Sequence, residues 1–151
     1  MSVGAIYHHF ADKDALAQAV WLDALERYQQ GFVEALRAQP DAGGGITGVV
    51  RFHLAWVARN RDLARILLGA RPPGARALNE PFFGEVRAWW RAHAHYGALA
   101  DLELDLAHAL WLGPSHEYCR QWLAGRSRRI PTTVADTLAQ AAWASVKGPN
   151  A

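Results

Sequence analysis

The amino-acid sequence predicts an all-helical (all-α) protein, and three observations support this prediction. Apolar residues recur at intervals of three and four along nearly the whole chain of 151 residues, as on one face of a helix. No segment shows the alternation of apolar and polar residues that is typical of a half-buried strand. Short groups of glycine and proline separate the helical segments, and a hydrophobic content of 51% suffices for a buried core.

The first two helical segments are expected at 3–9 and 13–38. The side chain of Asp12 can accept a hydrogen bond from the backbone of the following turn, so Asp12 is the predicted N-cap of the long second helix. This helix should end near Ala38, because Pro40 cannot continue it. Its apolar positions recur at turns of three and four, namely Leu16, Val20, Trp21, Ala24, Leu25, Tyr28, Phe32 and Leu36.

The segment 40–45, Pro-Asp-Ala-Gly-Gly-Gly, is the clearest break in the helical pattern. Because three consecutive glycines resist ordering in a helix, we expect a loop at this junction. The helix beyond it carries one apolar stripe, with Phe52 and Trp56 opening a second beside it, so we expect it to pack between neighbouring helices. The first stripe comprises Ile46, Val49, Val50, His53, Leu54 and Val57.

Two helices are expected in the middle of the chain. A short helix at 61–70 should stop at the Arg-Pro-Pro-Gly sequence of residues 71–74. Apolar and aromatic residues between 82 and 93 mark the next helix, which Gly97 is expected to end.

The carboxyl-terminal part of the chain predicts a final helical pair. A long helix from 101 to 124 should stop at Gly125. The last helix should begin at Pro131 or Thr132, and its small side chains permit the close approach of another helix.

Charge and cysteine content narrow the classes of function. The formal net charge is only +2, and the first 14 residues carry one lysine and two aspartates, so no basic surface for non-specific nucleic-acid binding is expected. The single cysteine, Cys119, excludes an intrachain disulfide, and we interpret it as a buried apolar side chain. The amino terminus lacks the apolar core of a signal peptide, and no apolar run reaches the roughly 18 residues that cross a bilayer. A soluble, cytoplasmic protein without a membrane partner is therefore expected.

Histidines offer the only superficial candidates for a metal site. His93 and His95 point to different sides of a helix, and His116 is not followed by a second histidine four residues later. A nucleophile elbow, a phosphate loop and a dinucleotide fingerprint are also lacking. The sequence therefore predicts no enzyme, no metal and no cofactor.

Residues 5–13 carry the most specific pattern, Ala-Ile-Tyr-His-His-Phe-Ala-Asp-Lys. This pattern resembles the recognition helix and following turn of the tetracycline-repressor (TetR) family of transcriptional regulators. The resemblance implies a TetR-like helical bundle whose recognition helix enters the DNA major groove. It also implies that a tyrosine and a lysine contact the DNA phosphates. The DNA-binding residues implied are Ser2, Val3, Gly4, Ala5, Tyr7, His8, His9 and Lys13.

The same resemblance implies two domains. Residues 1–38 correspond to a remnant of the helix-turn-helix domain, with the recognition helix at 3–9 and a long connecting helix, and 39–151 to a ligand-binding and dimerisation domain. Two helices that precede the recognition helix in the family are not represented. A start upstream of Met1, a shortened chain or a natural remnant would each account for this. We expect weak operator binding by residues 1–151 alone, because phosphate contacts would be few.

The seven tryptophans suggest where a ligand would bind. Several lie on helices that surround an effector pocket in the TetR family, and their large flat rings suit lipophilic or aromatic compounds. The alternative is a tightly packed core with no pocket. The ligand-binding residues predicted in this way are Phe52, Trp56, Trp90, His93 and Trp111.

A second resemblance concerns the helix at 101–124, where Leu-Gly-Pro at 112–114 is followed by Tyr118. It is similar to the penultimate helix of TetR-like regulators, which forms a four-helix dimer interface with the last helix. Pro114 removes a backbone donor and should bend this helix near Leu110. The dimer-interface residues predicted are Leu110, Gly113, Pro114, Tyr118, Leu138 and Ala142.

Taken with the motif, these features imply a TetR-like ligand-responsive transcriptional regulator, of the repressor type, that acts as a homodimer. Its partners would be a small lipophilic or aromatic effector and, given the preceding helices, double-stranded operator DNA. The rival hypothesis is a helical dimer that binds a ligand or a protein but no DNA.

Overall fold

A computed structural model describes residues 12–151 of the chain. Within this range the fold is all-helical, and the only pairing of strand type is one isolated bridge between Leu99 and Lys147. The prediction of an all-α protein is therefore confirmed. The helices are α2 (Lys13–Arg37), α3 (Ala42–Arg59), α4 (Arg61–Leu67), α5 (Ala75–His95), α6 (Leu104–Ala124) and α7 (Thr132–Val146).

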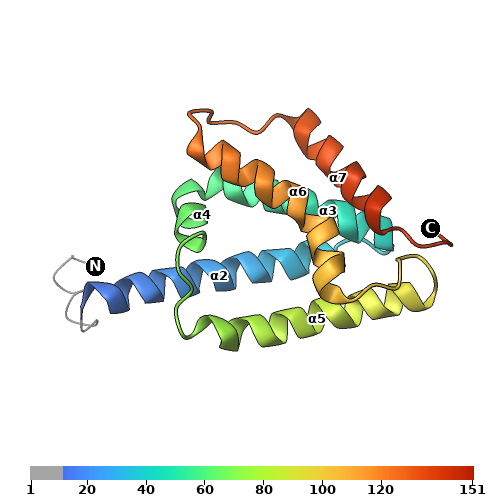
Figure 1. The fold of residues 1–151 in the computed structure, drawn as a ribbon, viewed down its shortest axis with the longest axis horizontal. Helices are drawn as coiled ribbons and strands as arrows, with labels where there is room; N and C mark the ends of the chain where they lie inside the picture. Colours follow the sequence, from blue (N-terminus) through green and yellow to red (C-terminus); the bar gives the residue numbers. More distant parts are fainter. Residues whose placement is uncertain (1–11) are drawn as a thin grey trace.

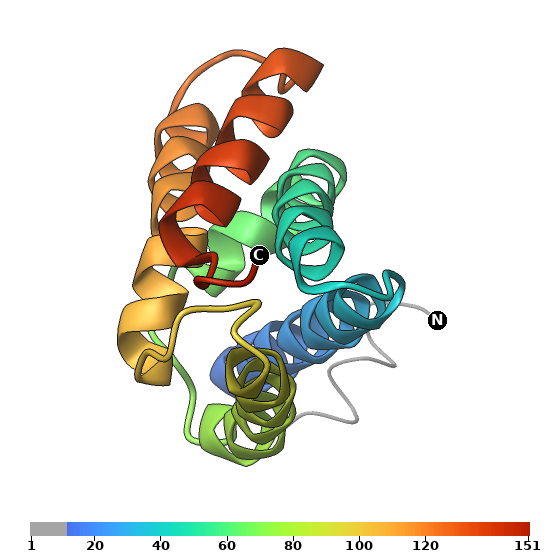
Figure 2. The same cartoon turned by 90° about the vertical axis from the view of Figure 1, so that its right-hand side faces the viewer.

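Helix α3 is the centre of the bundle. It lies between α2 on one side and the α6–α7 pair on the other, while α5 runs beside α2 (Figures 1 and 2). Residues 46–57 of α3 bury the predicted apolar stripe completely, because neighbouring helices cover that face. The prediction that this helix packs between neighbours is confirmed.

Helix α2 begins and ends where the sequence predicts. The Asp12 carboxylate accepts a hydrogen bond from the backbone N–H of Ala15 at 2.7 Å, which caps the first turn. The helix continues to Arg37, and its second half contributes Phe32 and Leu36 to the same hydrophobic cluster as α3, α6 and α7. Residues on both sides of the predicted domain boundary after residue 38 contribute to this cluster, and the division into two domains stays a prediction.

The predicted loop at 40–45 is wrong for residues 42–45, because α3 already begins at Ala42. The Asp41 carboxylate accepts a hydrogen bond from Gly44 N–H at 2.6 Å and caps this glycine-rich turn. The glycines are also needed for close packing, since a β-carbon on Gly45 would lie 2.5 Å from Cζ2 of Trp89. Capping and tertiary packing here outweigh the low helix propensity of glycine.

The other helix ends agree with the sequence to within a few residues. Gly97 follows α5 with a φ of +76°, a conformation that favours glycine, and Gly125 follows α6. The structure starts α5 at Ala75, directly after the predicted Pro-Pro-Gly stop at 72–74.

Helix α6 continues through Pro114 despite the missing backbone donor. The carbonyl of Leu110 would normally bond to residue 114. The hydroxyl of Ser145 in α7, which donates to the Ala142 carbonyl at 2.8 Å, lies 3.4 Å from it. This contact links α7 to α6 at the position where the sequence predicts a bend.

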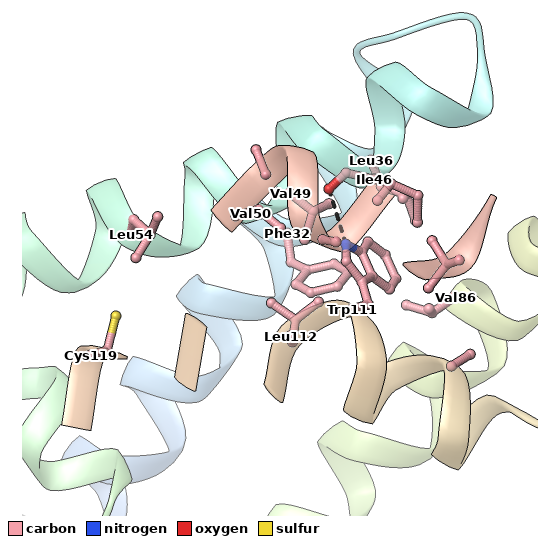
Figure 3. Packing of buried hydrophobic residues seen from close by; sticks show 14 of the residues in the cluster. Phe32, Leu36, Ile46, Val49, Val50, Leu54, Val86, Trp111, Leu112 and Cys119 are labelled. Carbon is pink, nitrogen blue, oxygen red and sulfur yellow. Dashed lines mark hydrogen bonds between the residues drawn. The ribbon is translucent and has the colours of Figure 1, made fainter. Parts of the chain in front are cut away.

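Trp111 lies at the centre of the hydrophobic core and has no exposed surface. Figure 3 shows its indole among Phe32, Leu36 and Val86, with a hydrogen bond from Nε1 to the carbonyl oxygen of Ile46 at 3.0 Å. One tryptophan of α6 therefore joins α2, α3 and α5.

None of the helices in residues 12–151 combines the length and the apolar character needed to cross a membrane.

Candidate ligand-binding cavity

A cavity of about 470 Å³ lies between α2, α3, α4 and α6. Its volume falls in the range of small-molecule sites, roughly 300–1,000 Å³. Aliphatic side chains form much of its wall, and tyrosine, tryptophan and histidine supply a few polar atoms among them. The aliphatic wall is formed by Leu25, Val57, Ala64, Leu67, Leu68 and Leu123.

Helical spacing explains how the polar side chains reach the same cavity. On α3, His53 and Trp56 are three residues apart and share one face. On α6, Gly113 and His116 have the same spacing, and a β-carbon on Gly113 would have no atom within 4 Å. Tyr28 completes this wall from α2. The absence of a side chain at Gly113 leaves open space on the α6 side.

Tyr28 and His53 form the central polar contact of the cavity. The Tyr28 hydroxyl and Nδ1 of His53 are 2.7 Å apart, and the Tyr28 ring meets the Trp56 ring edge-on with centroids 5.2 Å apart. Burial raises the pKa of Tyr28 above its usual range, so the phenol stays protonated. Burial, together with smaller contributions from the nearby His116 and His108, lowers the pKa of His53 to about 3, so its ring is neutral at pH 7.

Both partners of this hydrogen bond are neutral, and its direction follows the tautomer of the imidazole. With the proton on Nε2 of His53, Tyr28 O–H donates to Nδ1, and with the proton on Nδ1, that N–H donates to the Tyr28 oxygen. A neutral imidazole that accepts at Nδ1 carries its proton on Nε2. Nε2 of His53 is buried and has no hydrogen-bond partner in the described part of the chain.

Two more histidines extend from His53 along α6. The His116 ring centroid lies 4.8 Å from that of His53, and the His108 centroid lies 5.6 Å from His116. Burial, and to a smaller extent His108, lowers the pKa of His116 to about 4, although this residue keeps exposed surface. Among residues 12–151 no group of three or more histidine, cysteine, aspartate or glutamate side chains has the arrangement of a metal site.

Cys119 lies in the cavity wall as a protonated thiol. It is buried, and burial raises its pKa to about 12, which removes the thiolate that redox chemistry requires. The interpretation of Cys119 as a small apolar side chain fits this environment.

The rim of the cavity carries charged side chains. Arg120 pairs with Glu117 through two hydrogen bonds of 2.8 and 2.7 Å within α6. Arg71, beyond the end of α4, also lies at the rim and is exposed. The charges therefore lie at the entrance together with the exposed His116, and the interior is apolar except for the Tyr28 and His53 pair.

Of the five predicted ligand-binding residues, the structure places only Trp56 in this cavity wall. Trp111 is in the core, and Trp90 is also buried, with Nε1 donating to the carbonyl of Ala100 at 3.1 Å. The expectation that these rings surround one pocket is corrected, because both indoles satisfy their donors on backbone carbonyls within the packed core.

The remaining two predicted residues also lie outside the wall. Phe52 packs over Gly31, where a β-carbon would lie 2.5 Å from its ring. His93 packs against Trp89, with ring centroids 4.4 Å apart and the ring planes tilted by 51°. Sequence reasoning missed Tyr28, His53, Gly113 and His116 as cavity residues.

One sequence signal pointed to the missed site. His53 is the only polar residue in the apolar stripe of α3, and a buried polar side chain requires a partner. A tyrosine on the apolar face of the preceding helix was the available donor.

The predicted dimer residues divide into four groups by their exposure and position. Leu110 and Pro114 are exposed on α6, and Tyr118 and Leu138 are half-buried. Gly113 instead faces the cavity. Ala142 is buried in the protomer's own core, only 2% exposed, so its assignment to a partner surface is corrected.

The predicted DNA-binding residues Ser2, Val3, Gly4, Ala5, Tyr7, His8 and His9 lie outside the described residues. Lys13, the eighth of the set, is the first residue of α2 and is exposed.

Comparison with solved structures identifies proteins of similar fold. No family model matches the chain, and no curated protein matches its sequence. A TetR family transcription regulator from Marinobacter aquaeolei VT8 is similar in structure, with a TM-score of 0.79 and 15% identity over 98% of this chain and 80% of that chain. A regulatory protein in the TetR family from Rhodococcus RHA1 gives a TM-score of 0.73 and 21% identity over 98% of this chain and 81% of that one. A TetR family protein from Vibrio parahaemolyticus gives a TM-score of 0.62 and 17% identity over 97% of this chain and 81% of that one. At these identities the likeness establishes the fold, and the chain has the fold of TetR family regulators.

Proposed function

We propose that the protein is a TetR-like ligand-responsive transcriptional regulator, of the repressor type, that works as a homodimer in the cytoplasm. The observation that carries the proposal is the cavity among four helices, one of which is α2. The TetR fold and the recognition-helix pattern at residues 5–13 support it from independent directions. The proposal assigns no catalytic step to the cavity.

Helix α2 offers a direct route from the ligand to the DNA. Leu25 and Tyr28 lie in the cavity wall, and Lys13 begins the same helix 12 residues before Leu25, about 18 Å away at 1.5 Å per residue. A ligand that binds one position of α2 better than another shifts the population toward that position. Residues attached to the start of α2 then move with the helix.

An exposed apolar surface on α6 supports the dimer. Leu106 is 52% exposed and Leu110 is 38% exposed, and they are four residues apart on one face of the helix. Pro114 continues the same line, and Ala141 of α7 is also exposed. Contiguous apolar surface of this kind commonly marks a protein interface. We propose that the twofold mate covers it.

The dimer is tested by sedimentation equilibrium at micromolar protein. The unchanged chain of 16.7 kDa should sediment at about twice that mass, and Leu110→Asp should sediment as a monomer, because an unpaired charge would be buried in the interface. Tyr96→Asp is the matched control, since Tyr96 is 75% exposed and follows the last residue of α5. A wild-type monomer would contradict the dimer.

Regulation is tested by selecting double-stranded DNA from a random pool with the wild-type protein at low salt and micromolar concentration, where weak complexes are retained, then measuring release of the DNA by compounds that bind the cavity. Release without loss of the dimer would support the proposal. A dimer that binds compounds but retains no DNA sequence would instead indicate the ligand- or protein-binding module.

A further inference from the structure

Four arginines line a hollow between α4 and the segment at 125–131 that joins α6 to α7. Arg61 and Arg65 lie four residues apart on α4, and Arg126 and Arg128 belong to the joining segment. The hollow has a volume of about 500 Å³, and of the described residues no carboxylate belongs to its lining. It shares no lining residue with the candidate ligand-binding cavity. This arginine hollow is therefore a separate, purely cationic site.

Arg61 and Arg65 are held in place by backbone carbonyl groups. The Arg61 guanidinium donates to two carbonyl oxygens of the joining segment and lies 4.4 Å from the centre of the Trp122 ring. Arg65 donates to the carbonyl oxygen of Leu123 at 3.0 Å. A guanidinium has five N–H donors in a rigid plane, so these contacts fix its position and leave other donors available. The α4 side of the hollow is thus preorganised.

Arg126 and Arg128 have no part in these contacts. Both are exposed, and within residues 12–151 neither takes part in an ion pair. Arg65 pairs with the carboxylate of Asp62 at 3.3 Å, but the Asp62 side chain is 93% exposed, and such a pair is weak. The hollow therefore keeps an excess of positive charge, and an anion between the guanidinium groups would relieve their repulsion.

We propose that the arginine hollow binds a compact oxyanion with two or more negative charges, of the kind that a phosphate or diphosphate group carries. The planar fork of a guanidinium matches two oxygens of a phosphate group, and hydrogen bonds between charged partners are the strong ones. Arg61 and Arg65 hold the anion from α4, while Arg126 and Arg128 contact it from the joining segment. The site lies outside the effector cavity, so this inference does not depend on the proposed function.

The shape of the hollow favours a compact anion over the backbone of DNA. The phosphates of a DNA strand follow one another along an extended line, with one charge for about every 3.4 Å of the helix axis. A row of cations fits such a line, whereas this hollow gathers four cations around one space. We therefore expect a diphosphate, or a small molecule that ends in one, to fit better than a duplex.

The test titrates the full chain with pyrophosphate in a calorimeter at low ionic strength, where exposed charges are little screened. The wild type should bind pyrophosphate at one site. The double variant Arg126→Gln with Arg128→Gln should bind it about tenfold more weakly or worse, because two charge-assisted contacts are lost. Both side chains are exposed, so the variant should keep the helical circular dichroism of the wild type. No binding to the wild type would overturn the inference.

A second double variant, Arg87→Gln with Arg91→Gln, is the control for net charge. It removes the same charge from exposed positions on α5, which lies on the far side of the bundle from the joining segment (Figures 1 and 2). Its affinity for pyrophosphate should change by about twofold or less, because distant exposed charges are screened. Equal losses in the two double variants would show that net charge alone attracts the anion, and would overturn the site.

A DNA duplex of random sequence tests the other source of phosphate groups. In the same titration the duplex should bind the wild type and the Arg126→Gln with Arg128→Gln variant alike, because the proposed ligand is a compact anion. A duplex that binds the wild type and loses about tenfold in this variant, while pyrophosphate binds neither protein, would overturn the inference and assign the four arginines to DNA.

Discussion

Gly45 lies directly against the ring of Trp89, which joins the first turn of α3 to α5. A β-carbon on Gly45 would lie 2.5 Å from Cζ2 and 3.0 Å from Cη2 of the indole, and 3.2 Å from the carbonyl oxygen of Leu36. Real β-carbons do not approach a ring this closely, so the contact requires glycine at position 45.

Gly45→Ala should therefore lower the free energy of unfolding. Overpacking of this kind costs about 1–3 kcal/mol, and the gain in helix propensity, about 1 kcal/mol, offsets only part of it. Urea denaturation measures the difference. Gly48→Ala is the matched control, because its β-carbon would meet only the Ala35 carbonyl at an ordinary 3.5 Å, and we expect it to be neutral or stabilising. Equal effects of the two substitutions would refute the packing argument.

This glycine also shows why part of the fold could not be predicted. Apolar spacing and the Asp12 cap place α2 to within a residue, because these signals are local in the sequence. The glycines at 43–45 predict a loop by local propensity, but Trp89 is more than 40 residues away in the sequence, and its contact with Gly45 is tertiary. Local rules do not contain that information.

The sequence also predicts the candidate site only in part. Periodicity identified the buried face of α3, including His53, but a helical pattern does not distinguish a side chain that meets the core from one that meets a cavity. Trp56 and Trp111 were equivalent in the sequence, and only the first lies in the cavity wall. The open space beside Gly113 helps to form the cavity, and the hydrophobic periodicity of the sequence does not predict such a space.

Trp111→Phe should destabilise the protein more than Trp56→Phe. Trp111 is fully buried and donates to the Ile46 carbonyl at 3.0 Å, so its replacement leaves a cavity and removes a hydrogen bond, at a cost of about 2–4 kcal/mol. Trp56 is half-buried beside an existing cavity, and its replacement should cost about 1 kcal/mol or less. Thermal unfolding followed by circular dichroism measures both. A larger loss for Trp56→Phe would contradict the placement of Trp111 in the core.

Stability should fall as the pH drops below the usual pKa of histidine. The unfolded chain protonates His53 near pH 6.5, but burial holds the folded pKa at about 3, so between these values the unfolded state binds more protons. The stabilisation is complete above pH 6.5 and is lost as the pH falls from 6.5 toward 3, by at most about 1.4 kcal/mol per pH unit for one histidine.

Urea midpoints measured at pH 7 and pH 5.5 test this dependence on His53→Gln, which does not titrate and keeps an acceptor for the Tyr28 hydroxyl. The variant should lose less stability over this interval than the wild type. Some loss should remain, because His116 has a lowered pKa of about 4 and also titrates on unfolding. If the wild type and His53→Gln lost the same stability between pH 7 and pH 5.5, burial would not hold His53 neutral.

Arg61 should hold the segment between α6 and α7 in place. Its guanidinium donates to the carbonyl oxygens of Ser127 at 2.5 Å and Gly125 at 3.0 Å, and it lies 4.4 Å above the centre of the Trp122 ring. A lysine cannot reproduce this two-pronged, planar contact. Arg61→Lys should therefore increase hydrogen–deuterium exchange in residues 125–130, while the free energy of global unfolding changes by about 1 kcal/mol or less.

Arg59→Lys, at an exposed position near the end of α3, is the control and should leave exchange in this segment unchanged. Unaltered exchange in Arg61→Lys would show that the segment keeps its conformation without the guanidinium, and that Trp122 and the neighbouring backbone suffice to hold it.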